Sequence, residues 1–156
     1  MKRWVDRSRI ESALLNPALI ALIVSEAARE YEREAQPMSW PLAFLLPPLV
    51  LHRPTRDALP RATRTHLSTW IARHPVIRAG FPERAAAMTP LTREGLRFGL
   101  RHGALEFAGS AIRGLPTAAP PEGDLRLLTD KARFLGRWLA KTDQISTIFV
   151  LFGVQP

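Results

Sequence analysis

The sequence predicts a mainly α-helical protein with a small β part: a winged-helix-like helical domain with one β-hairpin and a C-terminal strand. A side chain that can cap a helix precedes a proline at Asn16 and again at Thr89, and this pair is typical of a helix start. Two short alternating runs between 104 and 115 indicate the hairpin. The apolar run 147–152 indicates the strand.

Length and composition favour one globular unit. A chain of 156 residues, of which 46% are hydrophobic and 23% charged, can bury a core without covalent cross-links. It contains no cysteine, which excludes disulfides, thiolate metal sites and a cysteine nucleophile. We expect a single domain over residues 1–156, with an N-terminal segment at 1–15 and a surface linker at 116–123.

The first predicted helix runs from Pro17 to about Ala35. Its first two turns are apolar on every side, so this half should be buried. Its second half alternates acidic residues with arginines, a pattern typical of a solvated face. The acidic residues assigned to that face are Glu26, Glu30, Glu32 and Glu34.

Prolines divide the next part of the chain. Trp40 and Pro41 should open a second apolar helix that kinks or ends near Pro47 and Pro48. A short helical turn at 55–57 follows. A third helix is predicted over 62–73, ending before Pro75. Its core residues should be Leu67, Trp70 and Ile71.

A fourth main helix is predicted over 90–102, closed by Gly103. Within it, Arg93, Arg97 and Arg101 recur every four residues, so their guanidinium groups should lie along one face. The hairpin that follows suggests a wing. A last helix should begin with Asp124 as its cap, before the C-terminal strand. The core side of that last helix should hold Leu125, Leu128, Ala132, Leu135 and Leu139.

Positive charge is concentrated in the middle of the chain. Residues 52–113 hold 11 arginines, no lysine and only four acidic residues, whereas both flanking parts are nearly balanced. The planar guanidinium group suits two-point contacts to phosphate or carboxylate. The residues in question form two clusters, Arg53, Arg56, Arg61 and Arg64, and Arg93, Arg97 and Arg101. They are expected to contact nucleic-acid phosphates or an acidic partner; an arginine face that is only solvated or paired internally is the alternative.

Motifs for catalysis and cofactors are missing. The four histidines lack the spacing of a metal site, no GK[ST] phosphate loop occurs, and no serine lies in a G-x-S-x-G elbow. We therefore expect no enzymatic activity and no cofactor. The N-terminus does not resemble a secretory signal, and the longest apolar run, 42–51, is half a membrane span. These features predict a cytoplasmic protein that does not enter a membrane.

Several segments, in the same order, resemble the middle component of bacterial ABC three-component systems. They are Asn16-Pro17, LHRPTRDALPRATRTHLSTWI at 51–71, FPERAAAMTPLTREGLRFGLRHG at 81–103 and the C-terminal WLAKTDQISTIFVLFGVQP. The resemblance covers about Asn16 to Pro156. It implies a non-enzymatic subunit between an SMC/Rad50-like ABC ATPase and an effector, such as a nuclease, in a Lamassu-type anti-phage complex.

Another function remains open: a free-standing winged-helix transcriptional regulator that binds double-stranded DNA. In that case the helix at 90–102 would enter a groove and the hairpin would flank it. The helix has arginines but few of the amide and hydroxyl side chains that read base edges, which favours the subunit. Trp4, in a charged N-terminal segment without a core pattern, is the candidate interface anchor.

Overall fold

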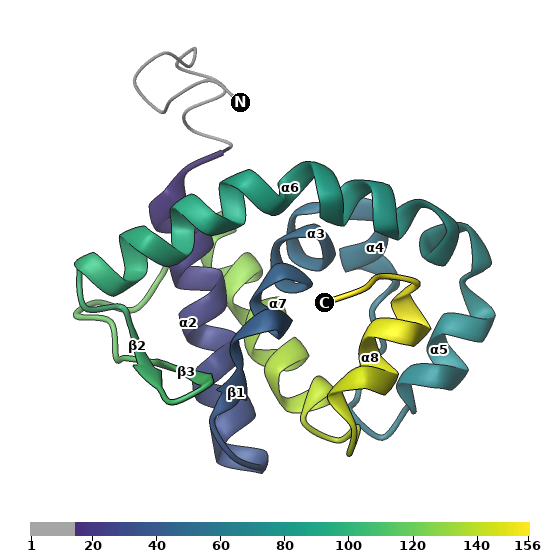
Figure 1. Cartoon of the computed structure of the whole chain (residues 1–156). Coiled ribbons are helices and arrows are strands. Elements are labelled where there is room, and N and C mark those ends of the chain that lie inside the picture. The colour runs from purple at the N-terminus through teal and green to yellow at the C-terminus, as the bar shows by residue number, and fades with distance from the viewer. Residues whose placement is uncertain (1–14) are drawn as a thin grey trace.

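The computed structural model describes residues 15–156, where helices dominate over one small sheet (Figure 1). The helices are α2 (Pro17–Glu34), the 3-10 helix η2 (Trp40–Phe44), α3 (Leu46–Leu51), α4 (Arg53–Ala58), α5 (Leu67–Arg73), α6 (Pro75–Arg101), α7 (Gly123–Leu139) and α8 (Ile145–Phe152). The strands are β1 (Met38–Ser39), β2 (Leu105–Ala108) and β3 (Ala111–Gly114). The predicted class, mainly α with a small β part, is confirmed.

Helix α2 contacts α3, α6, α7 and the sheet, and its predicted start is confirmed. The side chain of Asn16 accepts a hydrogen bond from the Ala18 backbone N–H at 2.8 Å, and Pro17 occupies the first turn. Around α2 lie α7 alongside it, α6 across its N-terminal half and the sheet on a third side (Figure 1). Burial of Ile20, Ile23 and Val24 on this helix therefore organises the core.

Glycines allow the neighbouring elements to approach α2 closely. A Cβ atom on Gly136 of α7 would overlap the carbonyl oxygen of Ala27, and one on Gly114 of β3 would overlap that of Ser25. Where α6 crosses, Gly99 lies against the side chains of Leu105 and Ala21. At Gly136 and Gly114 backbone meets backbone, so these two contacts tolerate no added carbon.

The predicted hairpin is confirmed and belongs to a three-stranded antiparallel sheet of order β1-β3-β2. Ile112 pairs with Phe107 on one side and with Met38 on the other. Met38 and Ser39, which no sequence pattern marked as a strand, supply the third strand. The hairpin follows α6 directly, as a wing would; DNA binding by this arrangement stays a prediction.

The predicted helix start at Thr89-Pro90 is wrong. Helix α6 runs without a break from Pro75 to Arg101 and contains Pro82 and Pro90. The Thr89 hydroxyl donates to the Ala85 carbonyl at 3.0 Å, one turn back, instead of capping a new helix. Pro90 is exposed, so water can satisfy the carbonyl that its missing N–H leaves open.

Other boundaries also differ from the prediction. Trp40 and Pro41 open the 3-10 helix η2 as predicted, and this helix ends at Phe44, close to the predicted boundary. Pro47 and Pro48 then occupy the first turn of α3, where a missing N–H costs nothing. Helix α5 begins at Leu67 instead of 62, although its predicted core residues are buried. Helix α7 begins at Gly123 with Glu122 as its cap. Asp124 therefore lies in the first turn, and Leu125 is exposed rather than inward.

The predicted C-terminal strand at 147–152 is wrong, because these residues belong to helix α8. Ile148, Phe149 and Phe152 are buried while Val150 is 70% exposed, which is the period of a helix and not of a strand. Gly153, with a φ of 71°, ends the helix in the left-handed region. A short apolar run alone does not distinguish a buried strand from a buried helix.

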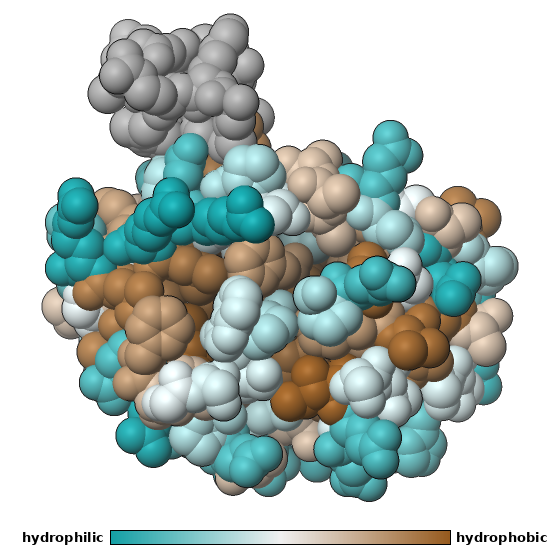
Figure 2. All heavy atoms as spheres, viewed as in Figure 1, coloured by the Kyte–Doolittle hydropathy of each residue, from teal (hydrophilic) through white to brown (hydrophobic). Residues whose placement is uncertain are grey.

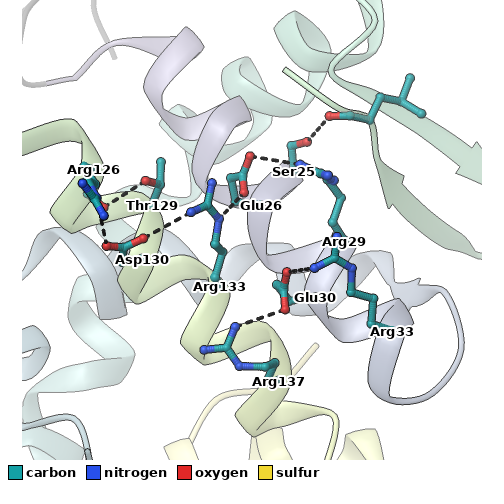
Figure 3. A network of polar contacts seen from close by, with 11 residues as sticks. Ser25, Glu26, Arg29, Glu30, Arg33, Arg126, Thr129, Asp130, Arg133 and Arg137 are labelled. Carbon is teal, nitrogen blue, oxygen red and sulfur yellow. Dashed lines mark hydrogen bonds and ion pairs between the residues drawn. The ribbon is translucent and has the colours of Figure 1, made fainter. Parts of the chain in front are cut away.

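The acidic half of α2 is also not the solvated face that the sequence predicts. Glu26 is 1% exposed and accepts a hydrogen bond from Arg133 of α7 at 2.5 Å (Figure 3). Two further rungs, Glu30 with Arg137 at 3.1 Å and Glu34 with Lys141 at 3.3 Å, have the same separation of 107 residues. The constant separation means that α2 and α7 run parallel, joined by a ladder of ion pairs.

The fourth acidic residue, Glu32, connects α2 to the sheet. Its carboxylate accepts a hydrogen bond from Arg113 of β3 at 2.8 Å. The Ser25 hydroxyl, on the same helix, donates to the carbonyl of Leu115 at 3.2 Å, just beyond the strand (Figure 3). Arg113, Arg133 and Arg137 are therefore engaged in contacts within the fold.

Candidate interaction surface

The C-terminal half of α6 carries the arginine stripe, defined as Arg93, Arg97 and Arg101. All three side chains are exposed, as their four-residue spacing predicts, because Gly95 and Gly99 occupy the buried side of the helix. Within residues 15–156 the three guanidinium groups form no hydrogen bond or ion pair. Figure 2 shows the corresponding row of hydrophilic side chains along this half of α6. The stripe is therefore available to an external anion.

Two surface hollows flank the arginine stripe. The first has a volume of about 520 Å³ and contacts Arg97 and Arg101. Its remaining lining is Asn16, Pro17, Glu94, Phe98 and His102. The second, here called the front hollow, has a volume of about 560 Å³ and contacts Arg93. The stripe thus forms a charged ridge between two less polar depressions.

The front hollow lies beneath α6, between η2, α8 and the C-terminal residues. Its aromatic lining consists of Trp40, Phe44 and Phe149, and the rings of Trp40 and Phe44 meet edge to face at 5.9 Å. Trp40 is 44% exposed. Figure 1 shows the C-terminal tail turning back towards the middle of the molecule below α6. Sequence reasoning missed this hollow because its lining comes from separate segments.

The other predicted cluster does not form one surface. Arg56 is largely buried and donates to the Val50 carbonyl at 2.9 Å, so it supports the fold. Arg53 pairs with Asp57 at 3.4 Å on the surface of α4. Arg61 and Arg64 are exposed and unpaired among the described residues. Figure 1 places α4 away from the C-terminal half of α6, so the two clusters are separate.

Beside this cluster, His52 caps α4. Its Nδ1 accepts a hydrogen bond from the Thr55 backbone N–H at 3.4 Å and lies 2.7 Å from the Thr55 hydroxyl. Burial lowers the pKa of His52, and the positive charge of Arg84 lowers it further. The imidazole therefore stays neutral and can act as the cap, a role that a protonated ring would lose.

Acidification should destabilise the protein through this cap. Because the pKa of His52 is lower in the folded chain than its ordinary value of about 6.5, the unfolded chain binds the proton more readily. The stability that the neutral His52 cap contributes is complete above the ordinary pKa and is lost as the pH falls through the lowered pKa of the folded chain. We expect thermal melts between pH 7 and 5 to show a smaller decline for His52→Asn, which keeps a cap.

The control for this experiment is His66→Asn, which changes an exposed histidine at the start of α5 where no side-chain cap is formed. This variant makes the same chemical substitution away from α4 and provides the reference melts at each pH. Equal pH dependence in wild type and His52→Asn would contradict the assignment of His52 as a titrating cap.

No metal or membrane feature emerges in the described part of the chain. Across residues 15–156, no three histidine, aspartate or glutamate side chains gather as metal ligands would. None of the helices found there combines the length and apolar character needed to cross a bilayer. Trp4, the predicted interface anchor, lies outside the described residues. Trp70 and Trp138 are buried, with their indole N–H groups bonded to backbone carbonyls.

Comparisons with known proteins identify one relationship. A protein-family model described as "ABC-three component (ABC-3C) system Middle Component 3" matches residues 4–156. Neither the curated proteins nor the solved structures contain a significant match to the chain. The family match covers the arginine stripe, both hollows and the ion-pair ladder in one unit.

Proposed function

Because the chain belongs to the Middle Component 3 family of ABC three-component systems, we propose that it is a non-enzymatic subunit that bridges an SMC/Rad50-like ABC ATPase to its effector. The anti-phage complex would be of the Lamassu type that the sequence resembles. The family match over residues 4–156 carries this proposal, since a middle component works with the other components of its system.

The surface of the protein supports a bridging role. A subunit that meets two partners needs two contact areas, and this chain offers two chemically different ones that adjoin at Arg93. The arginine stripe is charged and unpaired among the described residues, whereas the front hollow is mainly apolar. Exposed aromatic side chains such as Trp40 and Phe107, which is 62% exposed, are typical anchors of protein interfaces.

We assign the arginine stripe to DNA phosphates or to an acidic surface of a partner protein. Both ligands present oxygen pairs that a guanidinium group can bind at two points. The stripe suits backbone contact more than base reading, because its exposed neighbours on α6 include Pro90 and Phe98 rather than amide side chains.

Charge reversal of the stripe should separate these ligands. If phosphates are bound, Arg93→Glu with Arg97→Glu and Arg101→Glu should abolish DNA binding, whereas single reversals should lower the salt slope by about 1 each. If the ligand is an acidic protein surface, DNA binding by the purified chain is unchanged and copurification with a partner component is lost. Fluorescence anisotropy at several salt concentrations and tagged pull-downs measure the two effects.

A charge-matched control is the triple reversal of Arg33, Arg73 and Arg126, all exposed and outside both predicted arginine clusters. It changes net charge equally and should retain binding. Equal losses of binding in both triple variants would show that only the net charge of the protein matters. Unchanged binding in the stripe variant would show that the stripe arginines contact only solvent.

The bridging role is tested by coexpression of the chain with the neighbouring ATPase and effector genes, followed by deletion of this subunit. We expect the ATPase and effector to separate on size exclusion and protection from phage to be lost. If the remaining two components still assemble and still stop phage, the bridging role is wrong.

A second function is favoured by one observation, the hairpin that follows α6 directly. In a winged-helix regulator such a hairpin would flank the helix that enters the groove. This function predicts that the isolated chain binds one DNA sequence far more tightly than random DNA. Selection from a random-sequence DNA pool that yields no consensus would favour the subunit instead.

A further inference from the structure

The front hollow is formed mainly by helices of the described fold and not by a surface loop. Its walls come from η2, the middle of α6, the end of α8 and the four C-terminal residues 153–156. On α6, the wall consists of the small side chains of Ala85 and Ala86 between Pro82 and Thr89. Short side chains on one helix facing aromatic ones on the others leave a depression with an apolar floor.

The lining of the front hollow suits an apolar side chain of a partner that has an acidic side chain next to it. Its volume of about 560 Å³ is that of a pocket able to take a few large side chains. Arg93 supplies a charged side chain at the rim, and it has no ion-pair partner among the described residues. Arg97 and Arg101 continue the positive charge along the same helix. The hollow and its rim are therefore complementary to an apolar group beside a carboxylate.

None of the residues that line the front hollow belongs to a strand, so a bound peptide cannot form strand-like backbone hydrogen bonds there. Binding has to come from side chains presented along one face, as an amphipathic helix presents them in a groove. Figure 2 shows hydrophobic residues below α6 and a row of hydrophilic residues along it.

We propose that the front hollow docks an amphipathic helix of another component of the system, with its apolar residues on Trp40 and an acidic residue on Arg93. This inference rests on the proposed function and specifies where and how one partner is held. Trp40 provides a rigid aromatic surface that loses little entropy on binding. The adjacent arginine fixes the orientation of the bound helix.

Substitutions at Ala86 test the proposal with little risk to the fold, because this side chain is exposed and lines the hollow. Ala86→Glu places bulk and negative charge where the acidic helix docks, whereas Ala86→Lys adds similar bulk with the opposite charge. Ala87→Glu is the matched control, since Ala87 is the next residue of α6, is exposed and does not line the hollow. All three variants should melt as the wild type does.

The readout is copurification of each variant with the tagged ATPase and, separately, with the tagged effector. Ala86→Glu should weaken one of these pairs so that its copurification yield falls by at least about tenfold. Ala86→Lys should lose clearly less, and Ala87→Glu should match the wild type. That pattern supports an acidic apolar segment in the hollow.

Other patterns overturn the proposal in distinguishable ways. Wild-type yields with Ala86→Glu would show that the front hollow holds no partner. Equal losses with glutamate and lysine would rule out an acidic occupant, and a loss with Ala87→Glu would place the contact outside the hollow. A wild-type chain that copurifies with neither component would overturn the proposed function itself, and this inference with it.

Discussion

Replacing Gly136 by alanine should lower the free energy of unfolding by roughly 3 kcal/mol, although alanine is the better helix former. The added Cβ atom would overlap the carbonyl oxygen of Ala27, so α2 and α7 would have to move apart. Such a movement also lengthens the ion pairs that join the two helices and opens the core between them. Urea unfolding followed by circular dichroism measures the loss.

The matched control is Gly80→Ala, which makes the same change within a helix. There the added Cβ meets the end of the flexible Arg84 side chain, which can move aside. We expect a change within about 1 kcal/mol of the wild type, reflecting only the helix preference of alanine and the displaced guanidinium. If Gly136→Ala were as stable as Gly80→Ala, the close contact of α2 with α7 would be refuted.

Removal of the Glu26 carboxylate should cost about 3 kcal/mol of stability, because it breaks a buried ion pair from one side. The side chain of Glu26 is 2% exposed and binds both Arg133 and Arg29. The hydrogen bond from Arg133 to Glu26 raises the pKa of the guanidinium, while burial acts in the opposite direction. In Glu26→Ala, therefore, two partly covered cations lose this carboxylate: Arg29 is left without its ion pair, and Arg133 keeps only the one with Asp130.

Glu34→Ala provides the comparison within the same ladder. Its rung with Lys141 lies at the surface, where the two side chains are 35% and 48% exposed. Water and salt screen this pair, so we expect its removal to cost under about 1 kcal/mol. A double-mutant cycle between Glu26 and Arg133 isolates their coupling. Similar costs for Glu26→Ala and Glu34→Ala would contradict a buried, structural role for the first rung.

Local chemical signals predicted the parts of the fold that local interactions determine. The cap at Asn16, the hairpin around Gly109 and the inward Leu67, Trp70 and Ile71 all follow from short-range preferences. The same holds for exposure of the arginine stripe, because helical spacing alone decides which side chains share a face.

Signals that depend on distant neighbours misled the prediction. Thr89 and Pro90 have the composition of a helix start, but α6 packs on several elements at once and continues through them. The polar half of α2 has the pattern of a solvated face, and that pattern cannot distinguish water from an arginine on another helix. The apolar run of α8 likewise lacks the length that would decide its period.

The candidate surfaces divide in the same way. The arginine stripe lies on one segment and can be predicted from its spacing. The front hollow forms only where residues 40–45, 82–93 and 149–156 come together in the fold, so the sequence does not show it. Arg56 belongs to a basic run in the sequence and looked free to bind a partner. In the structure its guanidinium group donates a hydrogen bond to the Val50 carbonyl, which the sequence pattern does not reveal. Composition therefore indicated where charge is dense but not which charges are engaged.

The parallel ladder between α2 and α7 has a consequence for the order in which the chain matures on the ribosome. Arg133 is synthesised 107 residues after Glu26, which at typical translation speeds is about 5–20 seconds. During that interval the acidic and apolar flank of α2 has no covering helix. Helices α7 and α8, which are synthesised long after α2, therefore close this side of the core, and a nascent chain halted before Gly123 presents α2 to chaperones and proteases.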